Sequence, residues 1–223
     1  MPSTALSNYL RVALDIQATP FPGIHIADGV AAATDGVMLV VADWGEFLRG
    51  EGAISPRAAA VLAALAEVTW ISRIEVEGNR VCVTAQTTRY DEKLREEVAG
   101  EYQTVELPEF YCRRVPIVRM IRVLTDEKAG WVPLAENPSL KNLRDLKPKE
   151  FVALSGVYGE GNELFRPKAD GDTQWYSVAQ LRRGLKLFGA RARLSVRRSA
   201  KGWLAFEDNY GHTFAITPFT KHD

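Results

Sequence analysis

The sequence has few of the residues that build metal centres and disulfide frameworks. Its 223 residues include two cysteines, three histidines and three methionines. Cys82 and Cys112 are far apart in the chain, with no Cys-x-x-Cys motif and no pair of histidines beside them. This pattern predicts two reduced thiols, and it predicts neither a bound metal nor a resident cofactor.

Long apolar runs are also missing. Nowhere do about 18 uncharged apolar residues follow one another, which is roughly what a membrane-spanning helix needs. The first twenty residues contain no basic flank followed by an apolar stretch, so they do not have the pattern of a secretory signal. We therefore expect a cytoplasmic protein that does not enter the membrane.

Residue groups arranged for catalysis are absent as well. His222 lies next to the C-terminus, His25 has an Ile-His-Ile context typical of a strand, and His212 follows a turn signal. None of them has a nucleophile or an acid at a spacing that a known catalytic motif uses. We therefore predict no catalytic residues and a non-enzymatic protein, with an enzyme of unknown class as an alternative.

The composition is that of an ordinary globular protein, but its charges are unevenly distributed. Hydrophobic residues make up 46% of the chain, charged residues make up 25%, and the net charge is zero. Residues 1–137 contain 13 Lys and Arg against 19 Asp and Glu, whereas residues 138–223 contain 15 against 9. This asymmetry predicts an acidic α/β domain over 1–137 and a basic α+β domain with a helix and an antiparallel hairpin over 138–223.

Local patterns in the first half predict strands at Leu10–Ile16 and Val37–Ala42. Ser55-Pro56 is typical of a helix start, because serine caps the first turn and proline loses no hydrogen bond there. Residues 71–86 predict a hairpin around Gly78-Asn79, with Val76 facing Val81 and Glu75 opposite a half-exposed Cys82. Residues 90–102 predict a second helix, and the apolar run 115–124 suits either a strand or a helix.

The second half predicts one short helix on a small antiparallel sheet. Ser177 is expected to cap the helix, whose apolar residues recur at helical spacing, and strands are expected at 151–158, 191–196 and 203–206, with a last strand ending near Ile216. The fold class predicted for the whole chain is α+β, with two small mixed domains that are each an antiparallel sheet with packed helices.

Three short strings in the first half resemble the N-terminal domain of the Nfu/NifU-like scaffold proteins. They are Thr19-Pro20-Phe21-Pro22-Gly23, Ser55-Pro56-Arg57-Ala58 and Val81-Cys82-Val83-Thr84, within an expected order of strand, strand, helix, hairpin and helix over residues 10–103. The resemblance implies that fold and a role as an accessory factor in iron–sulfur cluster assembly. It offers no cluster ligands, because the Cys-x-x-Cys of the family's C-terminal domain is absent here.

The most concentrated chemical feature is the interval 173–206, which contains eight basic residues and no acidic one. Such a density of Lys and Arg can neutralise phosphates, and nearby aromatic rings can stack on exposed bases. The predicted binding residues are Arg182, Arg183, Lys186, Arg191, Arg193, Arg197, Arg198, Lys201, Trp175, Tyr176 and Trp203.

Three interpretations of this basic face remain open. It contacts nucleic acid, it contacts an acidic protein surface, or it is only solvated. The acidic surface belongs either to a partner or to the chain's own first half, where the candidate residues are Glu96, Glu97, Glu101, Glu106 and Glu109. The predicted function is therefore a binding or assembly protein whose basic C-terminal face contacts nucleic acid or an acidic partner, and its oligomeric state is left open.

Overall fold

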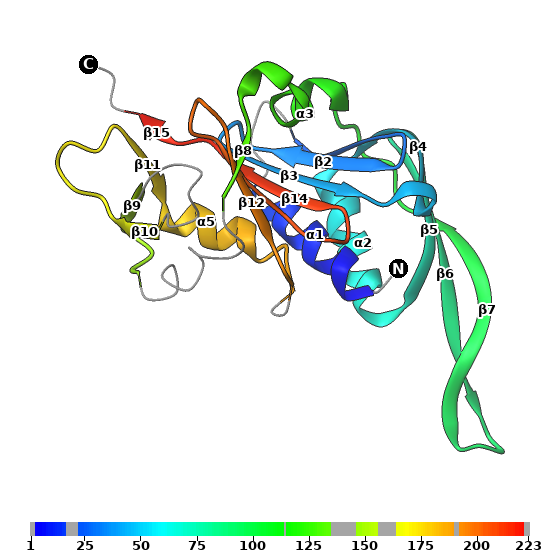
Figure 1. Ribbon diagram of the computed structural model, residues 1–223. Coiled ribbons are helices and arrows are strands. Elements are labelled where there is room, and N and C mark those ends of the chain that lie inside the picture. Colours follow the sequence, from blue (N-terminus) through cyan, green and yellow to red (C-terminus); the bar gives the residue numbers. More distant parts are fainter. Residues whose placement is uncertain are drawn as a thin grey trace.

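Two sheets and the helices packed on them make up the described part of the chain, which comprises residues 3–16, 22–113, 115–134, 146–155, 164–189 and 192–220 of a computed structural model (Figure 1). This arrangement confirms the predicted α+β class. Within these residues, no helix is long and apolar enough to cross a membrane.

Eleven of the described strands form one large sheet in the order β7-β6-β5-β4-β1-β2-β3-β14-β13-β12-β8. Neighbouring strands are antiparallel except β4 and β5, which run parallel. The strands are β1 (Ile24–Ala27), β2 (Val30–Thr34), β3 (Met38–Asp43), β4 (Leu48–Ile54), β5 (Trp70–Gly78), β6 (Arg80–Asp91), β7 (Glu96–Glu106), β8 (Val132–Pro133), β12 (Ser195–Arg198), β13 (Leu204–Glu207) and β14 (His212–Ile216).

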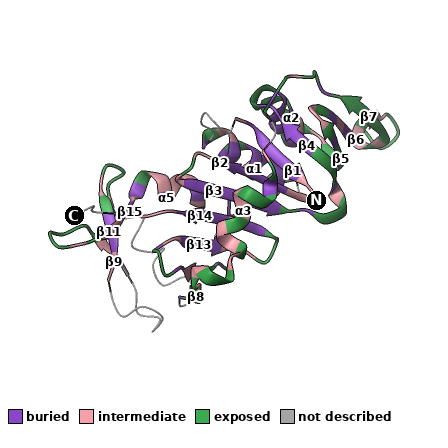
Figure 2. Ribbon diagram, turned by 90° about the horizontal axis from the view of Figure 1, so that it is seen from above, coloured by how far each residue is buried: buried purple, intermediate pink, exposed green. Residues whose placement is uncertain are grey.

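A smaller sheet lies beyond one end of the large one (Figure 2). Its strands follow the order β10-β9-β11-β15, with β9 at Phe151–Ser155, β10 at Leu164–Pro167, β11 at Gln174–Ser177 and β15 at Phe219–Thr220. Short 3-10 helices at Gly45–Phe47 (η1) and Glu127–Ala129 (η2) complete the described elements together with the helices below.

Helices cover both faces of the large sheet (Figure 1). On one face α1 (Ser3–Asp15), α2 (Pro56–Val68) and α5 (Val178–Leu185) share the main hydrophobic core, which includes Phe206 and Phe214. On the other face α3 (Ile117–Thr125) covers a second, smaller core that includes Ala205 and Ala215. The alternation of side chains along β13 and β14 separates the two cores.

The first element is a helix, so the predicted strand at Leu10–Ile16 is wrong. Leu6, Tyr9, Leu10 and Ala13 are all buried, and their spacing of three and four residues is that of one helix face. Within 10–16 alone, apolar and other residues roughly alternate, which is why so short a window suggested a strand.

The predicted hairpin at 71–86 is confirmed in its register. Val76 pairs with Val81, Ile74 with Val83, and Glu75 with a partly exposed Cys82. The predicted helix start is also confirmed: the Ser55 hydroxyl accepts the Ala58 N–H at 3.2 Å, and Pro56 opens α2.

Residues 90–102 form the end of β6, a turn and the first part of β7, so the second predicted helix is wrong. Asp91 closes a turn by accepting the backbone N–H groups of Lys93 and Leu94, and Arg95 takes a positive φ of 54°. The chain then returns as β7 and pairs with β6 from Cys82 to Asp91. Because β5 pairs with β6 only as far as Gln86, the rest of this hairpin is an exposed two-stranded arm (Figure 2).

The short-range predictions for the second half are confirmed at Ser177 and in three of the four strands, but the predicted strand at 191–196 is wrong over residues 192–194, because β12 begins only at Ser195. Ser177 accepts the Gln180 N–H at 3.4 Å and caps α5. Strands are present at 151–155, 195–198, 204–207 and 212–216. The ambiguous run 115–124 contains α3, whose Ile117 is buried in the second core.

Strands from both sides of residue 137 share the large sheet. β14 pairs with β3 over five residues, and β12 pairs with β8. The division of the chain into domains 1–137 and 138–223 stays a prediction. Strands from both of these ranges pair with one another in the large sheet.

Gly184 lies where α5 packs closely on β14. A Cβ at Gly184 would lie 2.1 Å from the Phe214 ring, whereas a Cβ at Gly189 would meet nothing within 4 Å. Overpacking a filled core costs about 1–3 kcal/mol. We expect Gly184→Ala to lower the free energy of unfolding by about that amount, measured by urea denaturation.

Gly189→Ala is the matched control, because it adds the same methyl group nearby, and it should leave the free energy of unfolding within about 0.5 kcal/mol of wild type. Equal stability of the two variants would contradict the packing of α5 on Phe214.

Candidate nucleic-acid interface

The basic residues of α5 lie on its solvent side. Val178, Leu181 and Gly184 face the main core, and Phe214 fills the space in front of Gly184. Arg182 and Arg183 are half-buried and Lys186 is exposed. Arg183 donates to the Asp15 carbonyl at 3.4 Å, which joins α5 to the C-terminal end of α1.

A segment before β9 adds two lysines beside this helix. The Val178 N–H donates to the Glu150 carbonyl at 3.1 Å, and the Arg182 guanidinium donates to the Leu146 carbonyl. Lys147 and Lys149 are exposed on this segment. We call the group of five cations Lys147, Lys149, Arg182, Arg183 and Lys186 the α5 cluster.

The acidic groups next to this cluster are few. The Glu150 carboxylate accepts the backbone N–H of Lys147 at 2.7 Å, so it closes the local turn. Asp15 is exposed at the end of α1. Among the residues that the structure describes, five cations against two carboxylates form a cationic surface that can attract phosphates.

The arginines of β12 do not join the α5 cluster. Arg197 pairs with Ala205, whose side chain belongs to the second core, and its guanidinium lies 4.8 Å from the centre of the Trp131 ring. It therefore lies on the α3 face of the sheet, opposite α5. Arg197 also binds the Glu207 carboxylate at 2.6 Å. The expected single basic face is thus divided by the sheet.

The other predicted cations take different positions. Arg198 donates to the Gln174 side chain at 2.7 Å, and Arg193 and Lys201 are exposed outside the α5 cluster. Arg191 lies outside the described residues.

The three aromatic residues predicted to bind bases lie in different environments. Tyr176 is 1% exposed and its hydroxyl donates to the Gly202 carbonyl, so its ring is closed to a base. Trp203 packs against the second core, on the α3 face. Trp175 is only half-buried, and the Lys168 ammonium lies 4.0 Å from the centre of its ring.

The acidic residues of β7 do not meet the basic residues of β12 within the molecule. Glu96, Glu97, Glu101 and Glu106 lie on β7, and β7 and β12 are near opposite ends of the eleven-stranded sheet. Glu106 instead binds Arg80 at 2.8 Å, which lowers the pKa of its carboxyl group. Docking of the basic face on this acidic strand of the same chain is therefore excluded by the topology.

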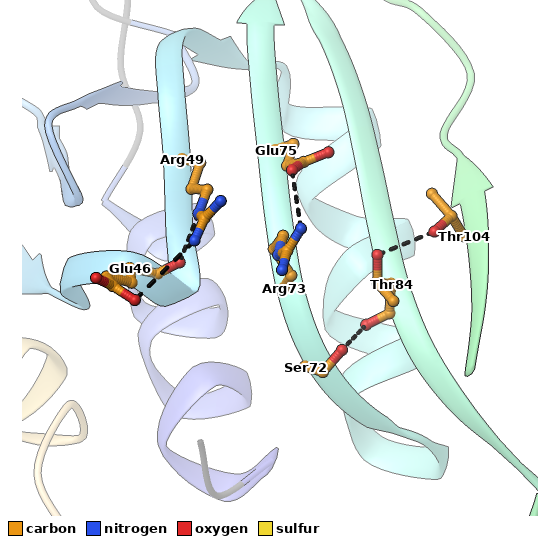
Figure 3. A network of polar contacts seen from close by, with 7 residues as sticks. All are labelled: Glu46, Arg49, Ser72, Arg73, Glu75, Thr84 and Thr104. Carbon is orange, nitrogen blue, oxygen red and sulfur yellow. Dashed lines mark hydrogen bonds and ion pairs between the residues drawn. The ribbon is translucent and has the colours of Figure 1, made fainter. Parts of the chain in front are cut away.

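The exposed face of β4, β5 and β6 has balanced charges (Figure 3). Arg49 donates to the Glu46 carbonyl at 3.3 Å, and Arg73 lies 3.4 Å from the Glu75 carboxylate. Beside them Thr84 links Ser72 to Thr104 through hydrogen bonds of 3.1 and 3.0 Å. A groove of about 420 Å³ on this face contains Cys82 and is bordered by both Arg and Glu. This surface lacks the excess of cations that phosphate binding needs.

Neither described histidine is available as a general base. The His212 Nδ1 is 2.9 Å from the Asp208 carboxylate and its Nε2 is 3.4 Å from the Trp44 indole nitrogen, so protein groups occupy both ring nitrogens. His25 is fully buried on β1 and accepts the Val115 N–H at 3.1 Å. Among the described residues, no three His, Cys, Asp or Glu side chains are grouped to hold a metal ion.

Comparison with known proteins identifies the fold. No protein-family model matches the sequence, and no curated protein sequence matches it. Solved structures do match. The DNA polymerase III subunit beta from Borrelia burgdorferi aligns over 100% of this chain at 10% identity with a TM-score of 0.59, and the Helicobacter pylori beta clamp bound to a DNA ligase peptide aligns over 97% at 12% identity with a TM-score of 0.57.

This chain spans 64% of the length of each of these two bacterial proteins. A chain of the PCNA2–PCNA3 complex from Sulfolobus tokodaii is similar over 99% of this chain and 98% of its own length, at 10% identity with a TM-score of 0.55. At these identities the likeness shows the fold, which is that of the sliding clamps.

The resemblance to the Nfu/NifU-like scaffold is therefore wrong. The similar structures named above are sliding clamps, and the expected order of elements is not present, because residues 3–15 are a helix and residues 90–102 are parts of two strands and the turn between them. Of the three strings, Ser55-Pro56 opens α2 and Val81–Thr84 lies in β6, whereas residues 19–21 lie outside the described part. None of the comparisons supports an iron–sulfur role.

The buried His25 predicts a pH dependence of stability. Burial lowers its pKa below the ordinary value of 6.5. As the pH falls below 6.5 the unfolded chain takes up a proton that the folded chain resists, so stability is lost until the pH reaches the folded-state pKa. We expect the melting temperature to fall between about pH 7.5 and pH 5.5.

His25→Gln removes the titrating group and keeps a hydrogen-bond acceptor for Val115. This variant should show a smaller fall over the same pH range than wild type. An unchanged pH dependence in the variant would assign the effect to other groups.

Proposed function

We propose that this protein is a non-enzymatic scaffold with a sliding-clamp fold that binds nucleic acid through the α5 cluster. The observation that carries the proposal is the position of five cations, Lys147, Lys149, Arg182, Arg183 and Lys186, on one side of a helix packed against the core. The similar structures add support, since their names include a DNA polymerase subunit and a clamp bound to a DNA ligase peptide.

The binding mode follows from the chemistry of these side chains. Lysine and arginine contact phosphates and release counterions, and such contacts do not depend on base sequence. The remaining predicted cations, Arg191, Arg193, Arg197, Arg198 and Lys201, are proposed as secondary contacts, with Arg197 the least accessible because Glu207 and Trp131 hold it.

Substitution of two exposed lysines tests the α5 cluster. We expect Lys147→Ala combined with Lys186→Ala to weaken binding of a fluorescent DNA duplex. The slope of log K against log salt should become shallower by about 0.9 for each phosphate that the variant no longer neutralises. Fluorescence anisotropy between about 50 mM and 300 mM salt measures both quantities.

The matched control is Lys93→Ala combined with Lys128→Ala. These lysines are also exposed, but they lie on the β6–β7 turn and on η2. If the control loses as much affinity as the test variant, binding follows net charge and the α5 cluster is not the interface.

A second candidate function is end-to-end association between copies of this chain. The acidic strand β7 is an edge strand of the large sheet, whereas α5 packs on β14 and β3 in the middle of the sheet, so β7 and the α5 cluster lie apart in one molecule (Figure 1) and can meet only between molecules. β7 also pairs on one side only, which leaves backbone groups on its other side open to another chain. In this candidate, the acidic partner of the basic face is β7 of a second copy of the chain.

We expect the mass measured by sedimentation to be larger at low salt than at high salt if copies associate in this way. Glu96→Lys combined with Glu101→Lys should abolish the larger species, because it reverses the charge of the exposed β7 end. Glu46→Lys combined with Glu127→Lys, which makes the same charge change elsewhere, should retain it. A monomer at every salt concentration would exclude this candidate.

A further inference from the structure

Three aromatic side chains gather on one face of the small sheet. Trp175 on β11 pairs with Phe219 on β15, and Ser177 on β11 pairs with Phe151 on β9. The rings of Phe151 and Phe219 meet edge to face with centres 5.5 Å apart. We call Phe151, Trp175 and Phe219 the aromatic platform.

The platform faces away from the core. Successive side chains of a strand point to opposite faces, and Tyr176, between Trp175 and Ser177, is buried in the main core. The platform side remains open: Phe151 is 41% exposed and Phe219 is 37% exposed. Large aromatic rings left this accessible mark an interaction surface.

Lysines lie beside the platform. The Lys168 ammonium is 4.0 Å from the centre of the Trp175 ring, and exposed Lys149 precedes Phe151 by two residues. The acidic groups of the neighbouring loop are Asp170 and Asp172, and Asp172 is held by Arg166 and by the Ala169 N–H. An aromatic surface with adjacent ammonium groups matches a ligand that has flat rings and negative charge.

We infer that the aromatic platform binds single-stranded nucleic acid by stacking on its bases. Bases in a duplex stack on one another and offer no free ring face, whereas unpaired bases stack on exposed aromatic side chains. The Lys168 ammonium lies over one face of the Trp175 ring, so a base that stacks on that face displaces it, and the displaced ammonium can then neutralise the phosphate of the stacked nucleotide. The inference rests on the proposed nucleic-acid function and adds a second site with a different preference.

The platform and the α5 cluster are continuous in the chain. Ser177 ends β11 and caps α5, and Lys149 belongs to the α5 cluster while lying next to Phe151. A strand whose bases stack on the platform can therefore continue its backbone toward the α5 cluster. This continuity predicts that the protein binds a junction of single and double strands more tightly than either form alone.

The test compares a labelled oligothymidylate of about twelve nucleotides, the matching oligouridylate and a duplex of equal length. Trp175→Ala and Phe219→Ala should each weaken binding to the single strands by roughly tenfold or more, with duplex binding unchanged. Trp70→Ala is the matched control, because Trp70 is 47% exposed on β5 of the large sheet, and it should bind as wild type does. Thermal melting confirms that each variant is folded.

A spectroscopic variant gives an independent readout. Stacking on Trp175 should quench its fluorescence, so Trp175→Phe should keep most of the affinity and lose this part of the quenching. A difference between the two oligonucleotides would assign the ligand as DNA or RNA.

The outcomes separate this inference from the proposed function. Wild-type affinity for single strands in both alanine variants would overturn the platform and leave the α5 cluster in place. Failure of wild type to bind any of the three ligands would overturn both.

Discussion

The pairing of β14 with β3 is the contact on which the rest of the structure depends. It joins residues 212–216 to residues 38–42 through five successive pairs, and so makes one sheet from distant parts of the chain. The alternation along β14 then sets both cores: Phe214 faces α5 and the main core, while Ala215 faces the second core under α3. Without this pairing, neither α5 nor the cations on it would have a fixed position.

Acidic and basic residues are equal in number over the whole chain, but the same topology places them in different parts of the molecule. The acidic strand β7 is one edge of the sheet, and the α5 cluster lies several strands away, on the helix that packs against β14 and β3. A molecule with two unlike ends can bind an acidic ligand such as nucleic acid at its basic end, or it can meet a second copy end to end. The arginines of the β4–β6 face contribute to neither, because each has a glutamate beside it.

Short-range features could be predicted from the sequence, and long-range ones could not. The Ser55 and Ser177 caps and the register of the 71–86 hairpin depend on neighbouring residues, and they are present as predicted. The structures of residues 10–16 and 90–102 were predicted wrongly because helix and strand patterns overlap in short windows. Contacts with distant or neighbouring elements, which a short window does not show, determine the structure there. Lys147 and Lys149 were missed because only the hydrogen bonds of Glu150 and Leu146 bring their segment beside α5.

The proposed function requires nucleic acid to contact the α5 side of the molecule. Hydrogen–deuterium exchange with and without a DNA duplex that carries a single-stranded end tests it most directly. We expect slower exchange at residues 146–152 and 174–188, with no change in β6 and β7. Protection confined to the opposite end of the sheet, or the absence of any protection at saturating ligand, would contradict it.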